Sequence, residues 1–230
     1  MKIHRFFLED KIGDKDSLII SSESMVNQMK NVFRFVEGDQ VMFFDNSGFD
    51  FVFKISGYEK DTIKLSRVEI RENAVLPYRE TYLFASLVKK DNFEWIAQKA
   101  TELGVSHIIP IVSERSEKKD LNSDRIQKII IEAAEQCGRG TLPVLYGVTD
   151  LESALRNYGH VKSLAWDPCS VKFVSQDLVS ILGSYIGPEG GWSQQELDLF
   201  ARHGIHLRSL GPQVLKSETA VVAVIAHLVF

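Results

Sequence analysis

The apolar residues in the first 72 positions follow the pattern of short β-strands. Every second residue from Phe49 to Ile55 is apolar, with Asp50 and Lys54 between them, which is the period of a half-buried strand. Further strands are predicted at residues 4–8, 17–20, 40–44 and 62–70, and apolar positions 25, 26, 29, 32 and 33 predict a helix within residues 22–33. Short strands around an aromatic core favour a small closed barrel.

A polar, proline-interrupted stretch from Arg71 to Pro77 marks the boundary between two predicted domains, residues 1–72 and 73–230. Beyond it, strands and helices alternate, which predicts a mostly parallel sheet. The strands are expected at residues 81–88, 105–112, 163–166, 184–186 and 205–210. The expected helix starts are Asp91 or Asn92, Ser123, Asp150, Ser193 and Ser217, with Gly104 and Gly138 as stops after the first two helices.

The last predicted helix, residues 217–230, is apolar on nearly every side. A helix without a polar face has to be buried. Burying one large apolar side chain is worth about 1.5–3 kcal/mol, so either the domain core or a second subunit is expected to cover this helix.

Composition and charge narrow the class of protein only partly. Of the 230 residues, 44% are hydrophobic and 25% are charged, as in ordinary globular proteins. No apolar run is long enough to span a membrane, and the N-terminal residues turn acidic too early for a signal peptide. Cys137 and Cys169 lack metal-ligand spacing, which suits a reducing cytoplasm. The net charge of −4 means that any binding of RNA depends on local basic patches.

Two glycine-containing loops are the strongest candidates for chemistry. Residues 186–193 and 210–220 each follow an apolar run, pass through a Gly/Pro turn and lead into a helix. Neither loop has the spacing of a P-loop or of the dinucleotide fingerprint. They are either tight strand–helix connections or, if they leave the same ends of neighbouring strands, the walls of a ligand crevice.

Seven segments of the chain resemble one known family. IGPEGGWSQQE and LGPQVLKSETA look like the two signature motifs of the ribosomal RNA small subunit methyltransferase E family, and HRFF, NVFRFVEGD, EWIAQKATELGVSHIIP, SERSE and IEAAEQCGRG match its other blocks in order. The resemblance implies an α/β fold in which a SPOUT-type, trefoil-knotted parallel-sheet domain follows a PUA-like β-barrel that holds RNA. It also implies S-adenosylmethionine as cofactor, N3 of a uridine in 16S ribosomal RNA of the small ribosomal subunit as target, and a homodimer without a metal.

The same resemblance assigns site residues. Three loops are expected to hold the cofactor, through Leu164, Trp166, Ile186, Gly187, Pro188, Gly190, Ser209, Leu210, Gly211, Val214 and Leu215. Methyl transfer to uridine N3 needs loss of a weakly acidic proton, so Glu189 is a candidate catalytic residue, with Arg139 and Lys216 as candidate cations. Arg5, Arg34 and Arg115 are candidate RNA contacts. Each charge has a plainer alternative as a helix-terminal or solvated side chain.

The chain departs from the family pattern at two positions. Gln213 and Lys216 stand where the second motif usually has arginine, and lysine lacks the planar fork of arginine. The substitutions leave open a protein that binds RNA in the same fold without catalysis. An unrelated nucleotide-binding metabolic enzyme is a third possibility. His203 and His206 are separated by a helix-ending Gly204, which argues against a metal site, and Cys137 is better explained as a core thiol than as a nucleophile.

Overall fold

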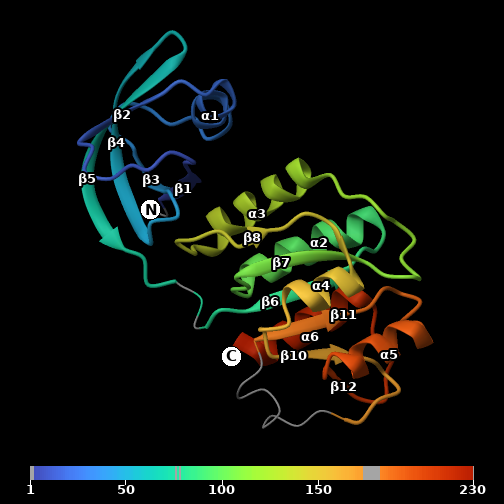
Figure 1. Cartoon of the computed structure of the whole chain (residues 1–230). Coiled ribbons are helices and arrows are strands. Elements are labelled where there is room, and N and C mark those ends of the chain that lie inside the picture. The colour runs from blue at the N-terminus through green and yellow to red at the C-terminus, as the bar shows by residue number, and fades with distance from the viewer. Residues whose placement is uncertain (1–2, 76, 78, 173–181, 230) are drawn as a thin grey trace. The chain divides into compact units, whose positions relative to one another are not determined.

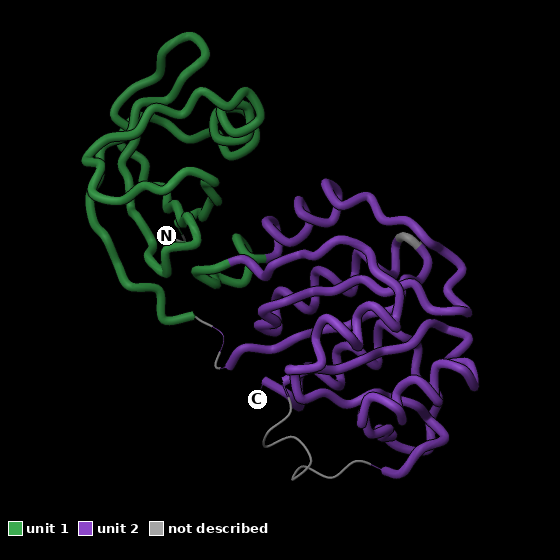
Figure 2. Tube along the Cα trace, in the orientation of Figure 1, with its two compact units in different colours: residues 1–76, 134–141 green, residues 77–133, 142–230 purple. Residues whose placement is uncertain are grey.

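The computed structural model describes residues 3–75, 77, 79–172 and 182–229. These residues form two compact units, which Figure 2 colours separately. One unit consists of residues 1–76 and 134–141, and the other of residues 77–133 and 142–230. Phe230, the predicted end of the last helix, lies outside the described residues.

The first unit contains one five-stranded sheet in the order β1-β3-β4-β5-β2 (Figure 1). Strands β1 and β3 are parallel, and the other neighbours are antiparallel. The strands are β1 (His4–Phe7), β2 (Ser17–Ile20), β3 (Gln40–Phe44), β4 (Phe49–Glu59) and β5 (Thr62–Glu72). The predicted helix is present as α1 (Glu23–Asn27), continued by the π-helical turn η1 (Gln28–Val32). The strand predictions are therefore confirmed.

The closed barrel is not confirmed. Within the described residues the sheet is an open path from β1 to β2, and these two edge strands do not pair. The alternation predicted along β4 also breaks, because a register shift between Val52 and Phe53 turns both side chains into buried positions. Phe49, in contrast, is 43% exposed.

The second unit is built on a parallel sheet in the order β12-β10-β11-β6-β7-β8, with β9 also paired to β7. The predicted α/β architecture is therefore confirmed. The strands are β6 (Tyr82–Ser86), β7 (His107–Val112), β8 (Val144–Leu145), β9 (Thr149–Asp150), β10 (Ser163–Trp166), β11 (Gly183–Ile186) and β12 (His206–Arg208). The helices are α2 (Lys90–Glu102), α3 (Ser123–Cys137), α4 (Leu151–Asn157), α5 (Gln194–Arg202) and α6 (Ser217–Val229).

Helices cover both faces of this sheet, as Figure 1 shows. Alternate residues of each strand enter different cores, so Leu83 and Ala85 pack with α2, α3 and α6 while Phe84 packs with α4 and α5. Tyr185 of β11 stacks on Phe84 with ring centroids 4.2 Å apart. Buried from both sides, the strands form a rigid platform for the loops that follow them.

Two helix starts differ from the predictions. The N-cap of α2 is Lys89, whose carbonyl accepts from Phe93 N, so neither Asp91 nor Asn92 caps the helix. At α3, the Asn122 side chain accepts from Arg125 N, one residue before the predicted cap Ser123. Asp150 and Ser193 cap α4 and α5 as predicted.

One face of α6 is buried. The expectation that the domain core covers this helix is therefore confirmed for that face alone. Val221, Val224, Ile225 and Leu228 join the core shared with α2. On its other sides, Val222, Ala223 and Ala226 are only half-buried.

Candidate functional site

The second unit contains a cavity of about 430 Å³ at the C-terminal ends of β10 and β11. Its walls are the loops that follow β10, β11 and β12, because parallel strands send their following loops to the same edge of the sheet. The two glycine-containing loops meet here. Their strands β11 and β12 are not neighbours, however, since β10 lies between them and contributes a third loop. The lining residues are Arg115, Trp166–Cys169, Ile186–Trp192, Leu197, Ser209, Leu210, Gln213–Leu215, Ser217 and Ala220.

The loop after β11 is shaped by a buried tryptophan. Trp192 is 4% exposed, packs edge-on against Phe200 and donates from Nε1 to the carbonyl of Trp166 over 3.1 Å. A Cβ at Gly187 would lie 3.1 Å from Cε2 of this indole. An alanine side chain at position 187 would therefore press against the indole, which the glycine backbone crosses in direct contact.

The start of α6 ties the two glycine-containing loops together. Ser217 Oγ donates to the carbonyl of Gly187 over 2.8 Å. Ser217 was expected to cap α6, but Ala220 N donates to the carbonyl of Lys216, which places Ser217 in the first turn of the helix. The cap prediction is therefore wrong, because the hydroxyl of Ser217 forms a bond to a loop that is distant in sequence.

The loops after β10 and β12 are joined by backbone hydrogen bonds. Asp167 N donates to the carbonyl of Arg208, and Ser209 N donates to that of Val171. The Ser209 hydroxyl accepts from Gly211 N over 3.2 Å, and Gly211 has a φ of +152° that favours glycine. Sequence reasoning did not find Asp167, Pro168 or Cys169, because this loop has no glycine to mark it.

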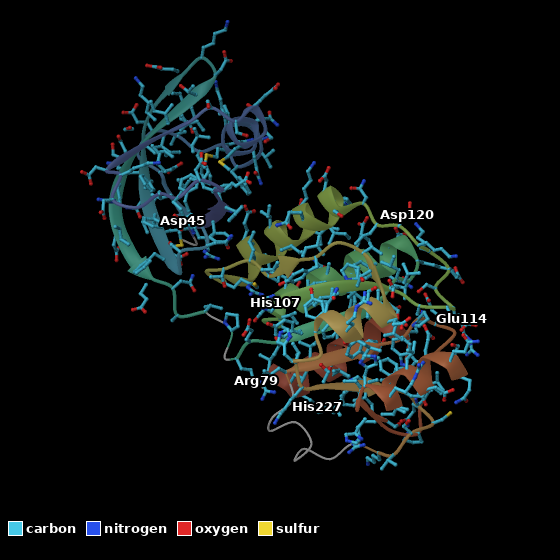
Figure 3. All side chains as sticks on the ribbon, viewed as in Figure 1. Asp45, Arg79, His107, Glu114, Asp120 and His227 are labelled. Atoms are coloured by element: carbon cyan, nitrogen blue, oxygen red, sulfur yellow. The ribbon has the colours of Figure 1, made fainter. Side chains whose placement is uncertain are left out.

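A third connection links the cavity to the loop after β7. In Figure 3, His107 marks the start of that strand, and Glu114 lies in the loop two residues beyond its end. Glu114 N donates to Oε1 of Glu196 over 2.9 Å, while Oε2 of the same buried carboxylate accepts from Ser193 N in the predicted capping box. Next to Glu114, Arg115 donates from Nη1 to the carbonyl of Gly190 over 2.8 Å.

Most of the predicted cofactor residues line the cavity. Those that do so are Trp166, Ile186, Gly187, Pro188, Gly190, Ser209, Leu210, Val214 and Leu215. Leu164 is instead 3% exposed within the core beneath it, and Gly211 shapes its loop without lining the cavity. Val214 and Leu215, at 80% and 37% exposure, are bare apolar side chains on the cavity wall.

Of the predicted catalytic residues, Glu189 lines the cavity and is exposed. Lys216 is exposed but does not line it. Arg139 belongs to the first unit, where it is 3% exposed, and this burial lowers the pKa of its guanidinium to about 10. It therefore remains charged at neutral pH.

The three predicted RNA contacts lie in different surroundings. Arg5 pairs with Asp50 over 2.6 Å, donates to the carbonyl of Ala134 and lies over the ring of Phe44, with a side chain that is 10% exposed. Arg34 is exposed, with a φ of +56°. Arg115 is the one basic side chain among the described residues that line the cavity.

The described residues contain neither a metal-binding cluster nor a membrane-spanning helix. No group of His, Cys, Asp and Glu in them is arranged to hold a metal ion. None of the helices formed by those residues is long and apolar enough to cross a membrane.

Comparison with known proteins agrees with the family resemblance seen in the sequence motifs. Residues 75–229 match the RNA methyltransferase domain family. The ribosomal RNA small subunit methyltransferase E of Bacillus subtilis is 30% identical over 95% of this chain and 93% of its own length. The crystal structure of the Neisseria gonorrhoeae enzyme of that name, bound to S-adenosylmethionine, aligns with a TM-score of 0.89 at 26% identity, covering 98% of this chain and 96% of that one. A Legionella pneumophila methyltransferase in complex with the same cofactor aligns at 0.88 and 27%, covering 99% and 97%.

Proposed function

Because the chain belongs to the ribosomal RNA small subunit methyltransferase E family, we propose that it transfers a methyl group from S-adenosylmethionine to N3 of a uridine in 16S ribosomal RNA of the small ribosomal subunit. The observation that carries the proposal is the single cavity wall made by the two signature loops and the loop after β10. The cofactor-bound relatives support the choice of methyl donor.

The cavity fits this cofactor in size and in charge. Its volume of about 430 Å³ is within the range of small-molecule sites. Its charged wall residues are Arg115, Asp167 and Glu189, which together carry one negative charge at neutral pH. The cofactor carries one net positive charge. Val214 and Leu215 would be covered by a bound ligand, which accounts for their exposure in the structure.

Different residues of the cavity would contribute to cofactor binding in different ways. Gly187 and Gly190 let the loop backbone lie directly against Trp192 and Arg115, and the bond from Ser217 to Gly187 holds the loop against α6. Trp166, Ile186, Leu210, Val214 and Leu215 supply apolar contacts, with Pro188 and Ser209 completing the wall. Leu164 packs in the core beneath these loops, and Gly211 shapes the loop after β12.

When bound, the cofactor would supply a methyl group on a positively charged sulfur. The sulfur would keep the electron pair of the C–S bond as the new N–C bond forms. The protein must position uridine N3 and remove its proton. We assign proton removal to the carboxylate of Glu189, which lines the cavity and is open to solvent, so the proton passes on to water. Lys216 and Arg139 stay predictions as cations that act on the substrate.

The remaining features follow from the family resemblance. Residues 1–72 would form the PUA-like RNA-binding domain, with Arg34, Arg5 and Arg115 as RNA contacts, and residues 73–230 the SPOUT domain with its trefoil knot. The half-buried apolar side of α6, with Val222, Ala223 and Ala226, supports pairing with a second copy into a homodimer. The enzyme would act in the cytoplasm, where ribosomal subunits are made.

Two measurements test the function. Titration calorimetry should give binding of S-adenosylmethionine, and Gly190→Trp, which forces an indole against Arg115 in the cavity wall, should abolish it. Small subunits from cells lacking the gene should gain one methyl group, which mass spectrometry of the digested RNA should place on a uridine base at N3. Binding of both cofactor and subunits without methyl transfer would instead support an RNA-binding protein that has lost catalysis, the alternative suggested by Gln213 and Lys216.

A further inference from the structure

Among the described residues that line the cavity, Arg115 is the one that carries a positive charge. We propose that Arg115 contacts the uracil ring and stabilises the negative charge that develops on it as N3 loses its proton. The inference rests on the proposed function and names a catalytic residue for that reaction. It is more specific than the RNA contact that the family resemblance implies for Arg115.

The chemistry of the uracil ring calls for a cation at this place. Loss of the N3 proton leaves a negative charge that the ring shares between N3 and the adjacent O2 and O4. A guanidinium offers several N–H donors in a plane and binds such oxygens through paired hydrogen bonds. Beside the low-dielectric interior of a protein, such a donor lowers the free energy of the anion more than it would in bulk water.

The contact between Arg115 and Gly190 brings the cation to the reacting groups. Nη1 of Arg115 donates to the carbonyl of Gly190 over 2.8 Å, next to the proposed base Glu189. A Cβ at Gly190 would lie 3.2 Å from Cβ of Arg115, so a bare backbone is what admits the arginine stem so closely. The other N–H groups of this exposed side chain are available to a substrate.

Hydrogen bonds of the neighbouring residues hold the backbone at Arg115 in place. Its neighbour Glu114 donates its N–H to Glu196, a carboxylate that is 5% exposed and also accepts from the N–H of the α5 cap Ser193. The turn is closed by Ser116 N donating to the carbonyl of Ser113, and the two buried serine hydroxyls lie 2.8 Å apart. A donor held in advance needs no reorganisation when charge develops, which is the condition for efficient electrostatic catalysis.

The step balances without another reactant. The N3 proton passes to the carboxylate of Glu189, and the electron pair left on N3 forms the bond to the methyl carbon. The pair of the broken C–S bond stays on the sulfur of the donor. Arg115 takes up no proton and forms no covalent bond; it lowers the pKa of N3–H.

Arg115→Gln tests the inference, with Lys119→Gln as the matched control, because Lys119 is an exposed cation of the same loop that does not line the cavity. We expect the rate constant of methyl transfer to small subunits in a single turnover to fall roughly 100- to 1,000-fold in Arg115→Gln. The dissociation constants of S-adenosylmethionine, by calorimetry, and of the subunit, by filter binding, should change less than about threefold. The control should keep the wild-type rate.

Two further readouts separate catalysis from support of the loop. The rate of Arg115→Gln should keep rising with pH beyond the point at which the wild type levels off, because the unassisted N3–H ionises at higher pH. Guanidinium ion added to Arg115→Ala should restore part of the rate. A loss confined to subunit affinity would identify a phosphate contact, and a loss confined to cofactor affinity would identify loop support; either overturns the inference, as does an unchanged rate. If the wild type itself transfers no methyl group to uridine N3, the proposed function fails instead.

Discussion

Gly187 offers the sharpest test of how the cavity is built. Its Cβ position lies 3.1, 3.3 and 3.4 Å from Cε2, Nε1 and Cδ2 of Trp192. Gly187 is not among the glycines with positive φ, so alanine would introduce a steric conflict without backbone strain. The conflict therefore depends on whether the indole can move.

The indole of Trp192 has little room to move. It is 4% exposed, packs against Phe200 with ring centroids 4.9 Å apart and donates to the carbonyl of Trp166. Overpacking of such a site costs about 1–3 kcal/mol. We therefore expect Gly187→Ala to lower the free energy of unfolding by about 2 kcal/mol and to weaken binding of S-adenosylmethionine, because the same backbone lines the cavity.

Urea denaturation and titration calorimetry measure the two effects, and Gly147→Ala is the matched control. A Cβ at Gly147 meets nothing within 4 Å, and its φ is also not positive, so the control should be neutral or slightly stabilising. In a Trp192→Phe background the cost of Gly187→Ala should shrink, since the ring that it meets is smaller. The reasoning is refuted if Gly187→Ala behaves like Gly147→Ala in both assays.

Three further predictions follow from contacts of single side chains. Glu196→Ala removes the carboxylate half of the α5 capping box and the acceptor for Glu114 N, so it should cost about 2–4 kcal/mol of unfolding free energy in urea; a cost no larger than that of the exposed Gln194→Ala would contradict this double role of the carboxylate. Asp50→Ala leaves the largely buried guanidinium of Arg5 without its carboxylate and should cost about 3 kcal/mol, against little for the exposed Asp61→Ala; equal costs would show that the pair is not structural. The backbone hydrogen bond from Ser153 lowers the pKa of the Asp150 carboxyl below its ordinary 3.8, so this group adds stability above that pH and loses it as the pH falls through the lowered folded value. Asp150→Asn keeps an N-cap acceptor that does not titrate, so its unfolding free energy should fall less steeply than that of the wild type below pH 3.8, and parallel curves would argue against this role.

The elements that were predicted correctly depend on local patterns. Apolar runs flanked by turns identified β10 and β11, and the Ser193–Glu196 pair identified the start of α5, because a capping box involves residues three apart. Where contacts distant in sequence decide, the prediction was wrong. The hydroxyl of Ser217 bonds to Gly187 instead of capping α6, and a register shift buries Val52.

In the candidate site, too, residues marked by a local pattern were predicted, and residues placed by distant contacts were missed. Gly187 and Gly190 stood out because glycine in a loop is a local signal. Asp167 to Cys169 became visible only when β10 was placed between β11 and β12, since strand order is a property of the whole sheet. The bond from Arg115 to Gly190 joins residues 75 positions apart, and no spacing rule could have indicated it.

The bond between Ser217 and Gly187 also bears on when the enzyme becomes competent during its synthesis. The cavity wall reaches from Arg115 to Ala220, so the pocket lacks a side until the ribosome has made α6. A nascent chain, or one cut short before Ser217, would carry the completed strands β6, β7, β10 and β11 and still have no closed place for a methyl donor. Such incomplete chains would not methylate ribosomal RNA.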